Sequence, residues 1–435
     1  MLQSIKNRWH ILTGAMVLAV CLFTAGTANA AYQVGEGDTY LKIGGLLQTW
    51  LTMTEDAAPT GDDWAAEFYI RRMRLMFYGQ VTDKVNFFIE TDSPNFGKGG
   101  NLDVSVFIQD AYVELNLHPM FQMDFGMILL PFSHHGMQGA TSLFGLDYHS
   151  ALIKYPAGST KVWRDFGVMF RGLLSKWLEY RLGVFRGAWR NAGDVERTSA
   201  DGTYSYMEPE DPRNDKTIPR LTGRLTLNIF EPEGGAGVGG MFYDGLYLSK
   251  TDDGIVSTKK VLSIGASIDW QKDQNITFDP VPGAPAAGAP TPVRGVDETS
   301  DYVGVAGDVF LDLPLGQRKV MSLNGQVNFY YYNYGDRSDG DTYWDASGNK
   351  SAYTGLGIMS EIGFRYQAFQ PLFLFDWYNS TKAADDDTGD YMGIFGGFNY
   401  WMLGHSVSFK AQFGADKSSG GDFGMAAKIQ SQLLF

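Results

Sequence analysis

The chain has 435 residues, a formal net charge of −14 at pH 7 and 14% aromatic residues. So acidic a chain is a poor candidate for nucleic-acid binding, which needs a basic surface to neutralise phosphates. Its one cysteine, Cys21, excludes an internal disulfide or a cysteine-rich metal site. No stretch after residue 30 approaches 18 consecutive apolar residues, so the sequence predicts no membrane-spanning helix.

Residues 1–30 have the pattern of a secretory signal peptide. Lys6 and Arg8 precede an apolar run from Ile11 to Phe23, and Ala28-Asn29-Ala30 supplies the small residues of a cleavage site. The apolar run is shorter than the roughly 20 residues that a membrane anchor needs. We therefore expect cleavage near Ala30, which would leave an exported chain without cysteine.

About sixteen segments with strand-like alternation follow. They are expected near residues 40–54, 67–81, 85–92, 104–117, 121–130, 162–174, 178–189, 218–229, 260–271, 301–313, 319–332, 353–368, 372–379, 391–401, 406–413 and 422–435. Tight turns, expected at residues 82–84, 118–120, 175–177 and 369–371, alternate with longer polar loops. This asymmetry is typical of the periplasmic turns and extracellular loops of an outer-membrane barrel.

The last twelve residues indicate how such a sheet ends. Alternate apolar residues up to Phe435 share one face, while Lys428, Gln430 and Gln432 share the other. A sheet with lipid on one side must close on itself to satisfy its edges. The fold class expected is therefore all-β, a transmembrane antiparallel β-barrel of about 16 strands spanning residues 31–435, in the outer membrane of a Gram-negative bacterium. Its terminal Phe435 is the expected contact of the barrel-assembly machinery.

One connection is longer than its position in this pattern predicts. Residues 230–259 stand where a short periplasmic turn is expected, and they contain a glycine-rich run followed by the more apolar segment from Met241 to Leu248. If this connection contains a hairpin, the strand count rises to about 18.

Two long loops differ in composition. Residues 131–160 carry more apolar side chains than a solvated loop does, and we expect them to fold into the lumen and constrict it; packing over the barrel rim is the alternative. The candidate residues of this constriction are His134, His135, Asp147 and Lys154. Residues 272–300 are rich in proline and glycine, which predicts an extracellular loop.

Charged residues on the polar faces of the strands are candidates for setting selectivity. The pore-lining candidates are Arg72, Arg74, Arg164, Arg171, Arg181, Arg220, Arg224, Arg365, Glu114, Asp124 and Lys410. A one-sided arginine track would favour anions, and arginines opposite carboxylates would set up a transverse field. Alternatively, the charges pair across strands and stiffen the wall. Arg164 cannot share a face with Asp165 in a regular strand, so it needs a bulge or a position at the rim.

Catalysis and metal binding have little support in the sequence. His134, His135 and His149 share one loop and could bind a metal ion, but no thiolate or H-E-x-x-H spacing accompanies them. A rim hydrolase would need a serine, a histidine and an acid to converge. We expect neither an enzyme nor a cofactor.

Four segments resemble the phosphate-selective porin family of the O and P type. They are Ile108 to Val113, Phe125 to Ser133, Arg164 to Val168 and Arg220 to Arg224. The resemblance implies a 16-stranded, homotrimeric channel whose third long loop constricts the lumen, with phosphate preference owed to an arginine and lysine track.

The expected function is passive diffusion of small hydrophilic solutes or ions, anions such as phosphate among them, through an outer-membrane porin. The alternative is a structural barrel that sheathes a multihaem cytochrome in an electron conduit. The chain has no C-x-x-C-H motif, so it could only be the sheath.

Overall fold

The computed structural model describes residues 31–61, 63–149, 151–152, 163–187, 194–198, 205–209, 218–233, 240–280, 293–334, 354–380, 389–418 and 420–435. The expected signal peptide, residues 1–30, and Lys154 of the expected constriction lie outside these residues.

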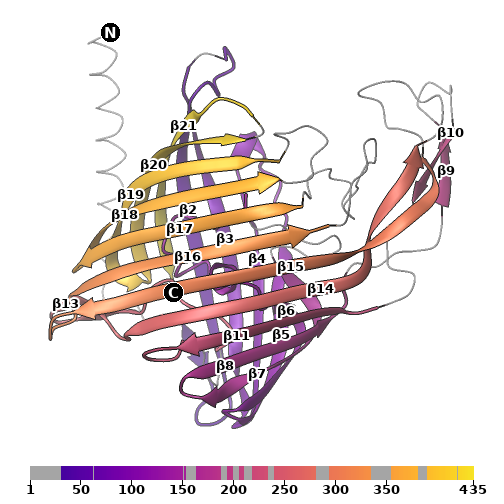
Figure 1. Cartoon of the computed structure of the whole chain (residues 1–435). Coiled ribbons are helices and arrows are strands. Elements are labelled where there is room, and N and C mark those ends of the chain that lie inside the picture. Colours follow the sequence, from indigo (N-terminus) through magenta and orange to yellow (C-terminus); the bar gives the residue numbers. More distant parts are fainter. Residues whose placement is uncertain are drawn as a thin grey trace.

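Among the described residues, sixteen antiparallel strands form one closed barrel, which confirms the predicted fold class (Figure 1). Each strand pairs with the barrel strands before and after it, and the barrel closes where β2 pairs with β21. The strands are β2 (Tyr40–Thr54), β3 (Ala65–Thr82), β4 (Val85–Asp92), β5 (Phe107–His118), β6 (Phe121–Leu129), β7 (Arg164–Ser175), β8 (Leu178–Phe185), β11 (Arg220–Asn228), β14 (Val261–Pro280), β15 (Val293–Leu315), β16 (Met321–Asn333), β17 (Gly355–Tyr366), β18 (Phe369–Ser380), β19 (Tyr391–His405), β20 (Val407–Ser418) and β21 (Gly424–Leu434).

The two ends of the described chain meet at this seam. The Phe435 amide donates to the carbonyl of Gly45 (3.0 Å), and the Gly45 amide donates to the carbonyl of Phe435 (2.8 Å). Beyond that point β1 (Tyr32–Val34) takes over the pairing with the start of β2. A Cβ atom at Gly45 would lie 2.6 Å from the Phe435 ring, so glycine is required for the terminal ring to rest there.

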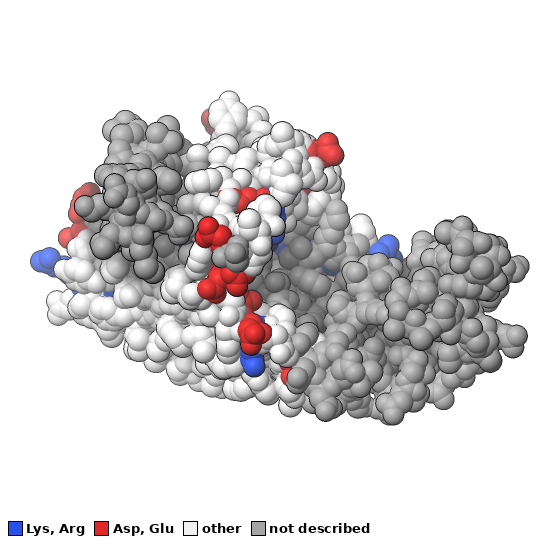
Figure 2. All heavy atoms as spheres, turned by 90° about the horizontal axis from the view of Figure 1, so that it is seen from above, with Lys and Arg blue, Asp and Glu red and all other residues white. Residues whose placement is uncertain are grey.

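The barrel is apolar outside and polar inside. Along β5, Val113 is 42% exposed, whereas Asp110 and Glu114 are buried on the opposite face, as the alternation predicted. Most of the described surface in Figure 2 carries neither basic nor acidic side chains. This reverses the pattern of a soluble protein and suits a wall that faces lipid.

The long connection between β11 and β14 does contain a hairpin. β12 (Leu248–Thr251) pairs with β13 (Gly254–Ser257), but the two strands form a separate sheet. The expectation that a hairpin here would raise the count to 18 is therefore wrong, because the hairpin does not enter the wall. A further separate pair, β9 (Asp194–Thr198) with β10 (Ser205–Pro209), lies in the connection between β8 and β11.

Two predicted boundaries also need correction. β14 and β15 stay paired as far as Pro280 and Val293, so most of residues 272–300 is strand, and residues 281–292 lie outside the described residues. Residues 369–371 begin β18; the tight turn is at Gln367 and Ala368. Gln367 has a φ of 53°, the left-handed conformation that lets the chain reverse within two residues.

Helical structure in the described residues is limited to two short 3-10 turns, η1 (Lys98–Gly100) and η2 (His135–Met137). None of the described helices has the length and apolar character to cross a membrane.

Candidate functional site

Residues 130–149 and 151–152, which we name the inner loop, lie against inward-facing side chains of the barrel. At one wall, the His134 amide donates to Asp308 of β15 (3.1 Å), and the His135 amide donates to Asn328 of β16 (3.2 Å). These acceptors are buried on the polar faces of their strands. The inner loop therefore enters the barrel directly after β6 instead of covering its rim.

The tip of the inner loop is held by the opposite wall. The Lys410 ammonium on β20 donates to the carbonyls of Leu143 (2.5 Å) and Gly145 (2.7 Å). Side-chain amides of neighbouring strands hold three more carbonyls: Gln48 binds Ala140 (3.1 Å), Gln432 binds Thr141 (2.8 Å) and Asn399 binds Phe144 (2.8 Å). The loop thus crosses the lumen from β15 and β16 to the group of β19, β20, β21 and β2.

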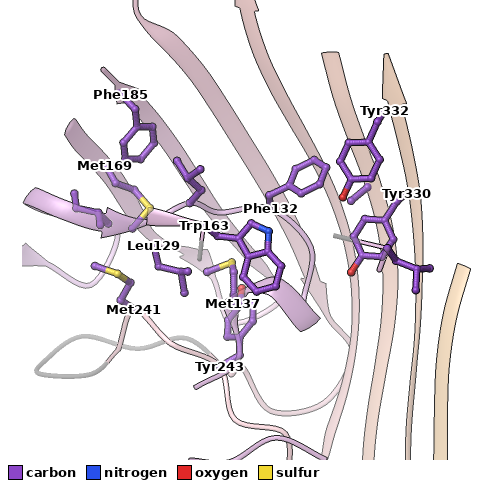
Figure 3. Close-up of a cluster of buried hydrophobic side chains, with 14 of the residues drawn as sticks. Leu129, Phe132, Met137, Trp163, Met169, Phe185, Met241, Tyr243, Tyr330 and Tyr332 are labelled. Atoms are coloured by element: carbon purple, nitrogen blue, oxygen red, sulfur yellow. The ribbon is translucent and has the colours of Figure 1, made fainter. Parts of the chain in front are cut away.

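Apolar packing fixes the base of the inner loop inside an otherwise polar barrel. Figure 3 shows Phe132, Met137 and Trp163 beside the tyrosines Tyr330 and Tyr332 of β16. The Phe132 ring centroid lies 6.2 Å from that of Tyr330 and 5.9 Å from that of Tyr332. Burial of such side chains stabilises the loop in place, which accounts for its unusually apolar composition.

A second segment, residues 240–257, enters from the end of the barrel that carries the short turns; we name it the inner hairpin. Arg181 donates to the carbonyl of Met241 (2.6 Å), and the Tyr243 hydroxyl donates to Glu179 (2.9 Å). At the far end of the segment, Arg365 donates to the carbonyl of Ile255 (2.8 Å). The sequence allowed for a hairpin here but did not predict that it packs inside the barrel.

The inner loop and the inner hairpin are joined to each other. The Gly139 amide donates to the carbonyl of Tyr243, and the Tyr243 amide donates to the carbonyl of Met137, both at 3.0 Å. The Gly245 amide donates to the carbonyl of Ser142 (3.1 Å), and a Cβ atom at Gly245 would lie 2.2 Å from that oxygen. Glycine is therefore needed at this crossing, and the two segments form one connected body in the lumen.

The three loop histidines have separate partners. His134 lies flat between Tyr243 and Phe310, with ring centroids at 5.0 and 4.1 Å, and its Nε2 lies 2.7 Å from Glu233. His135 Nε2 accepts the His149 amide (3.1 Å). The described residues contain no group of three or more histidine, cysteine or acidic side chains arranged to hold a metal ion.

His149 ties the end of the inner loop to two carboxylates. Its Nδ1 donates to Asp376 (2.5 Å) and its Nε2 to Glu361 (2.9 Å). Burial by itself would lower the pKa of His149, because it disfavours the charged imidazolium. Attraction to Asp376 and Glu361 is stronger than this effect and raises the pKa to about 10. Burial, with the nearby His149 charge, lowers the pKa of His135 to about 3. The neutral His135 ring is what allows its Nε2 to accept a hydrogen bond.

Six predicted pore-lining arginines are buried on the inward face, each paired with a carboxylate. The pairs are Arg74 with Glu90 (2.7 Å) and Asp92 (3.0 Å), Arg164 with Asp110 (3.0 Å), Arg171 with Asp124 (2.8 Å) and Glu114, Arg181 with Glu179 (2.7 Å), Arg220 with Asp269 and Asp165 (3.6 Å), and Arg224 with Asp308 (2.6 Å). Five of the six arginines pair across strands, and Arg181 pairs with Glu179 of its own strand, β8. The structure therefore favours charge pairing along the wall over an open arginine track. Arg164 is the first residue of β7, after Trp163 with a φ of 61°, so it takes the predicted rim position.

Arg72 pairs with Asp147 of the inner loop. Its neighbour Arg71, which the sequence pattern did not assign to the lumen, contacts the same carboxylate. Arg71 Nη2 lies 2.9 Å from Asp147, and Arg72 contacts the other carboxylate oxygen. The register between β2 and β3 shifts here, since Gln48 pairs with Arg72 and Thr49 with Ile70, which makes Arg71 the extra residue of a bulge. The signal was present, because regular alternation would have put Arg71 into lipid at a cost of about 2–4 kcal/mol at the bilayer midplane.

A cavity of about 280 Å³ lies between the inner loop and the wall, toward the end of the barrel that carries the long loops. Aromatic and aliphatic side chains line it together with charged groups. They include Trp50, Tyr391, Phe395, Asp416, Gln412 and Lys428.

The sequence and the fold both have known counterparts. The family model described as phosphate-selective porin O and P matches residues 54–284. Among solved structures, Salmonella typhi OmpF in complex with daunomycin is similar at 11% identity, over 92% of this chain and 100% of that chain, with a TM-score of 0.53. Pseudomonas putida OprB at high pH is similar at 9% identity, over 91% of this chain and 94% of that chain, with a TM-score of 0.50. Among curated proteins, none matches this sequence.

Proposed function

This chain belongs to the phosphate-selective porin O and P family, and we propose that it is a passive channel for small hydrophilic solutes that lacks a specific preference for phosphate. The family match covers more than half of the chain, and the barrel has the porin fold. The protein is therefore an outer-membrane channel of a Gram-negative bacterium rather than an enzyme.

The observation that carries the proposal is the pairing of the lumen arginines. Arg171, Arg220 and Arg224 each contact one or two buried carboxylates of strands one or two positions away in the barrel. A phosphate ion competes for the same guanidinium donors, so a track that binds it needs donors that carboxylates do not already occupy. Among the described residues, the strands offer no such arginine track.

Charge at the mouth supports a weak preference for cations. Figure 2 shows several acidic side chains near the centre of the view and others toward its edges. Carboxylates outnumber basic side chains at the described strand ends that carry the long loops. These acids are Glu55, Asp56, Asp63, Glu67, Asp103, Asp390, Asp416 and Asp422. Such a rim raises the local concentration of cations at low ionic strength.

The inner loop and the inner hairpin would act as the constriction. Both lie among inward-facing side chains, so they narrow the path that a solute can take. The alternative function, a barrel that sheathes a cytochrome, has no supporting observation. The inner loop and the inner hairpin already occupy space in the lumen that a cytochrome would need.

Single-channel recording in planar bilayers tests this function. Under a potassium chloride gradient we expect small, resolved open steps and a reversal potential displaced slightly toward potassium. Millimolar phosphate should leave the chloride current unchanged. A block of that current by phosphate would overturn the proposed lack of phosphate preference, and a folded barrel that inserts but never conducts would overturn the channel itself.

Processing and assembly form a separate part of the proposal. We infer cleavage near Ala30, insertion through the barrel-assembly machinery by way of Phe435, and a homotrimer in the outer-membrane lipid. The exposed Phe435 ring at the barrel seam supports the second step. Intact mass spectrometry of the purified protein tests cleavage and oligomeric state together; an uncleaved chain or a monomer would contradict this part alone.

A further inference from the structure

The cavity beside the inner loop combines apolar side chains with charged ones. Trp50, Phe395 and Leu374 contribute from three different strands, and Leu146 closes the side formed by the inner loop. Its volume of about 280 Å³ is just below the range of about 300–1,000 Å³ for small-ligand sites, so only a small molecule fits. A hydrated inorganic ion would gain nothing from such walls.

Two hydrogen-bond donors face this cavity from adjacent strands. Lys428 and Gln412 are opposite each other in the pairing of β21 with β20. The Lys428 ammonium lies 5.9 Å from the ring centroids of both Trp50 and Phe395, without a carboxylate within ion-pair distance among the described residues. The side-chain nitrogen of Gln412 is buried without a hydrogen-bond acceptor.

The charge around Trp50 is positive on balance. Asp147 is shared by two guanidinium groups, and the Arg71 guanidinium lies 5.4 Å from the Trp50 ring centroid. On the other side of the cavity, Asp376 and Glu361 share the charge of His149, so that side stays acidic. Asp416 also lines the cavity, and among the described residues it has no basic partner within ion-pair distance. The Trp50 end of the cavity therefore suits an anion.

We propose that this cavity binds a small organic carboxylate with an aromatic or apolar body. The carboxylate accepts hydrogen bonds from the Lys428 ammonium and the Gln412 amide, and the body lies against the Trp50 and Phe395 rings. This inference rests on the proposed channel function, because the lumen is the route by which the solute reaches the site, and it adds a solute class that the channel retains. Inorganic phosphate lacks the body that the rings would contact.

Calorimetric titration of the folded full-length protein in detergent micelles with benzoate tests the site. We expect saturable binding of benzoate at pH 7, and at least tenfold weaker binding of benzamide, which keeps the ring and loses the charge. Inorganic phosphate should not displace benzoate. Equal binding of benzamide would overturn the role of the carboxylate, and displacement by phosphate would overturn the role of the aromatic body.

Variants identify the groups involved. Lys428→Met should weaken benzoate binding roughly tenfold to hundredfold, the worth of a charge-assisted hydrogen bond. Gln412→Met should weaken it less, because the lost donor is neutral, and Asp416→Asn should strengthen it by removing a like charge. Lys417→Met is the matched control, since Lys417 lies on β20, the strand that pairs with the strand of Lys428, but outside the cavity lining.

The variant results separate this inference from the porin function. If Lys428→Met and Lys417→Met bind benzoate equally, the proposed site is wrong whatever the channel conducts. If the protein conducts ions but does not bind benzoate, the channel function stands and the inference fails. If it binds benzoate but never conducts, the site stands and the channel function fails. A heat-modifiability gel confirms that each variant is folded before titration.

Discussion

The two walls of the lumen use charge in opposite ways. From β3 to β15, buried arginines and carboxylates of the barrel strands satisfy one another, as in the pair of Arg224 on β11 with Asp308 on β15. From β16 through β21 to β2, amides and one ammonium bind backbone carbonyls of the inner loop, as Lys410 does. The charges of the first wall pair with one another, whereas the second wall binds the backbone of the inner loop and borders the cavity.

The difference shows where selectivity resides in this lumen. The wall with more charges presents little net charge to a solute, because almost all of its arginines are neutralised at short range. The wall with fewer charges leaves Lys428 uncompensated beside an apolar surface. The number of charged residues in a wall is thus a poor guide to ion preference, and their pairing is the better one.

Breaking a pair in the first wall should have the largest effect. Arg224→Met leaves Asp308 buried without its cation, and we expect a loss of about 3–5 kcal/mol in the free energy of unfolding. Urea unfolding of the detergent-folded barrel measures it. Adding Asp308→Asn removes the stranded charge while keeping an acceptor for the His134 amide. If the double variant is as unstable as Arg224→Met, the unpaired charge of Asp308 is not the cause of the lost stability.

Releasing the inner loop from the second wall should change transport more than stability. Lys410→Met removes two charge-assisted hydrogen bonds to the loop tip, each worth about 1.5–3 kcal/mol. We expect larger and noisier conductance steps in planar bilayers, because the tip no longer holds to β20. Lys417→Met on the same strand is the control and should conduct like the wild type. Unchanged steps in Lys410→Met would mean that the loop tip does not limit the current.

The contact of His149 with both Asp376 and Glu361 predicts a pH dependence. Because folding raises the pKa of His149 from 6.5 to about 10, its contribution to stability is complete below pH 6.5 and is lost as pH rises to about 10. The stability difference between the wild type and His149→Gln should therefore be larger at pH 6 than at pH 10.5. A difference that is constant with pH would show that the imidazolium is not involved.

Neutralising the acidic mouth should have the smallest effect. Asp56→Asn combined with Asp422→Asn removes two exposed charges from the long-loop end, and Asn tolerates the left-handed φ of 52° at Asp56. The reversal potential should move slightly toward chloride in about 0.1 M salt, where the Debye length is about 10 Å. It should not move in about 1 M salt, where the Debye length is about 3 Å. A shift that persists in high salt would place the selective charge deeper in the lumen.

The alternation of apolar and polar residues was sufficient to predict the barrel. Each of the sixteen segments became a strand, and inward positions such as Asp110 and Glu114 were assigned correctly. The prediction worked because a strand has a period of two, so the sequence alone states which side chains face lipid. Arg71 was missed because the bulge in β3 breaks that period, and the arginine that regular alternation would have placed in lipid was the one sign of it.

The residue pattern alone predicted that a barrel forms, that it has about sixteen strands and that arginines such as Arg171 and Arg224 face inward. Only the tertiary structure decided which carboxylate each arginine meets, because that depends on the register between strands. It also decided that the inner hairpin lies inside the barrel and joins the inner loop through Gly139 and Tyr243. Contacts between segments about one hundred residues apart depend on the geometry of the closed barrel, which no local pattern encodes.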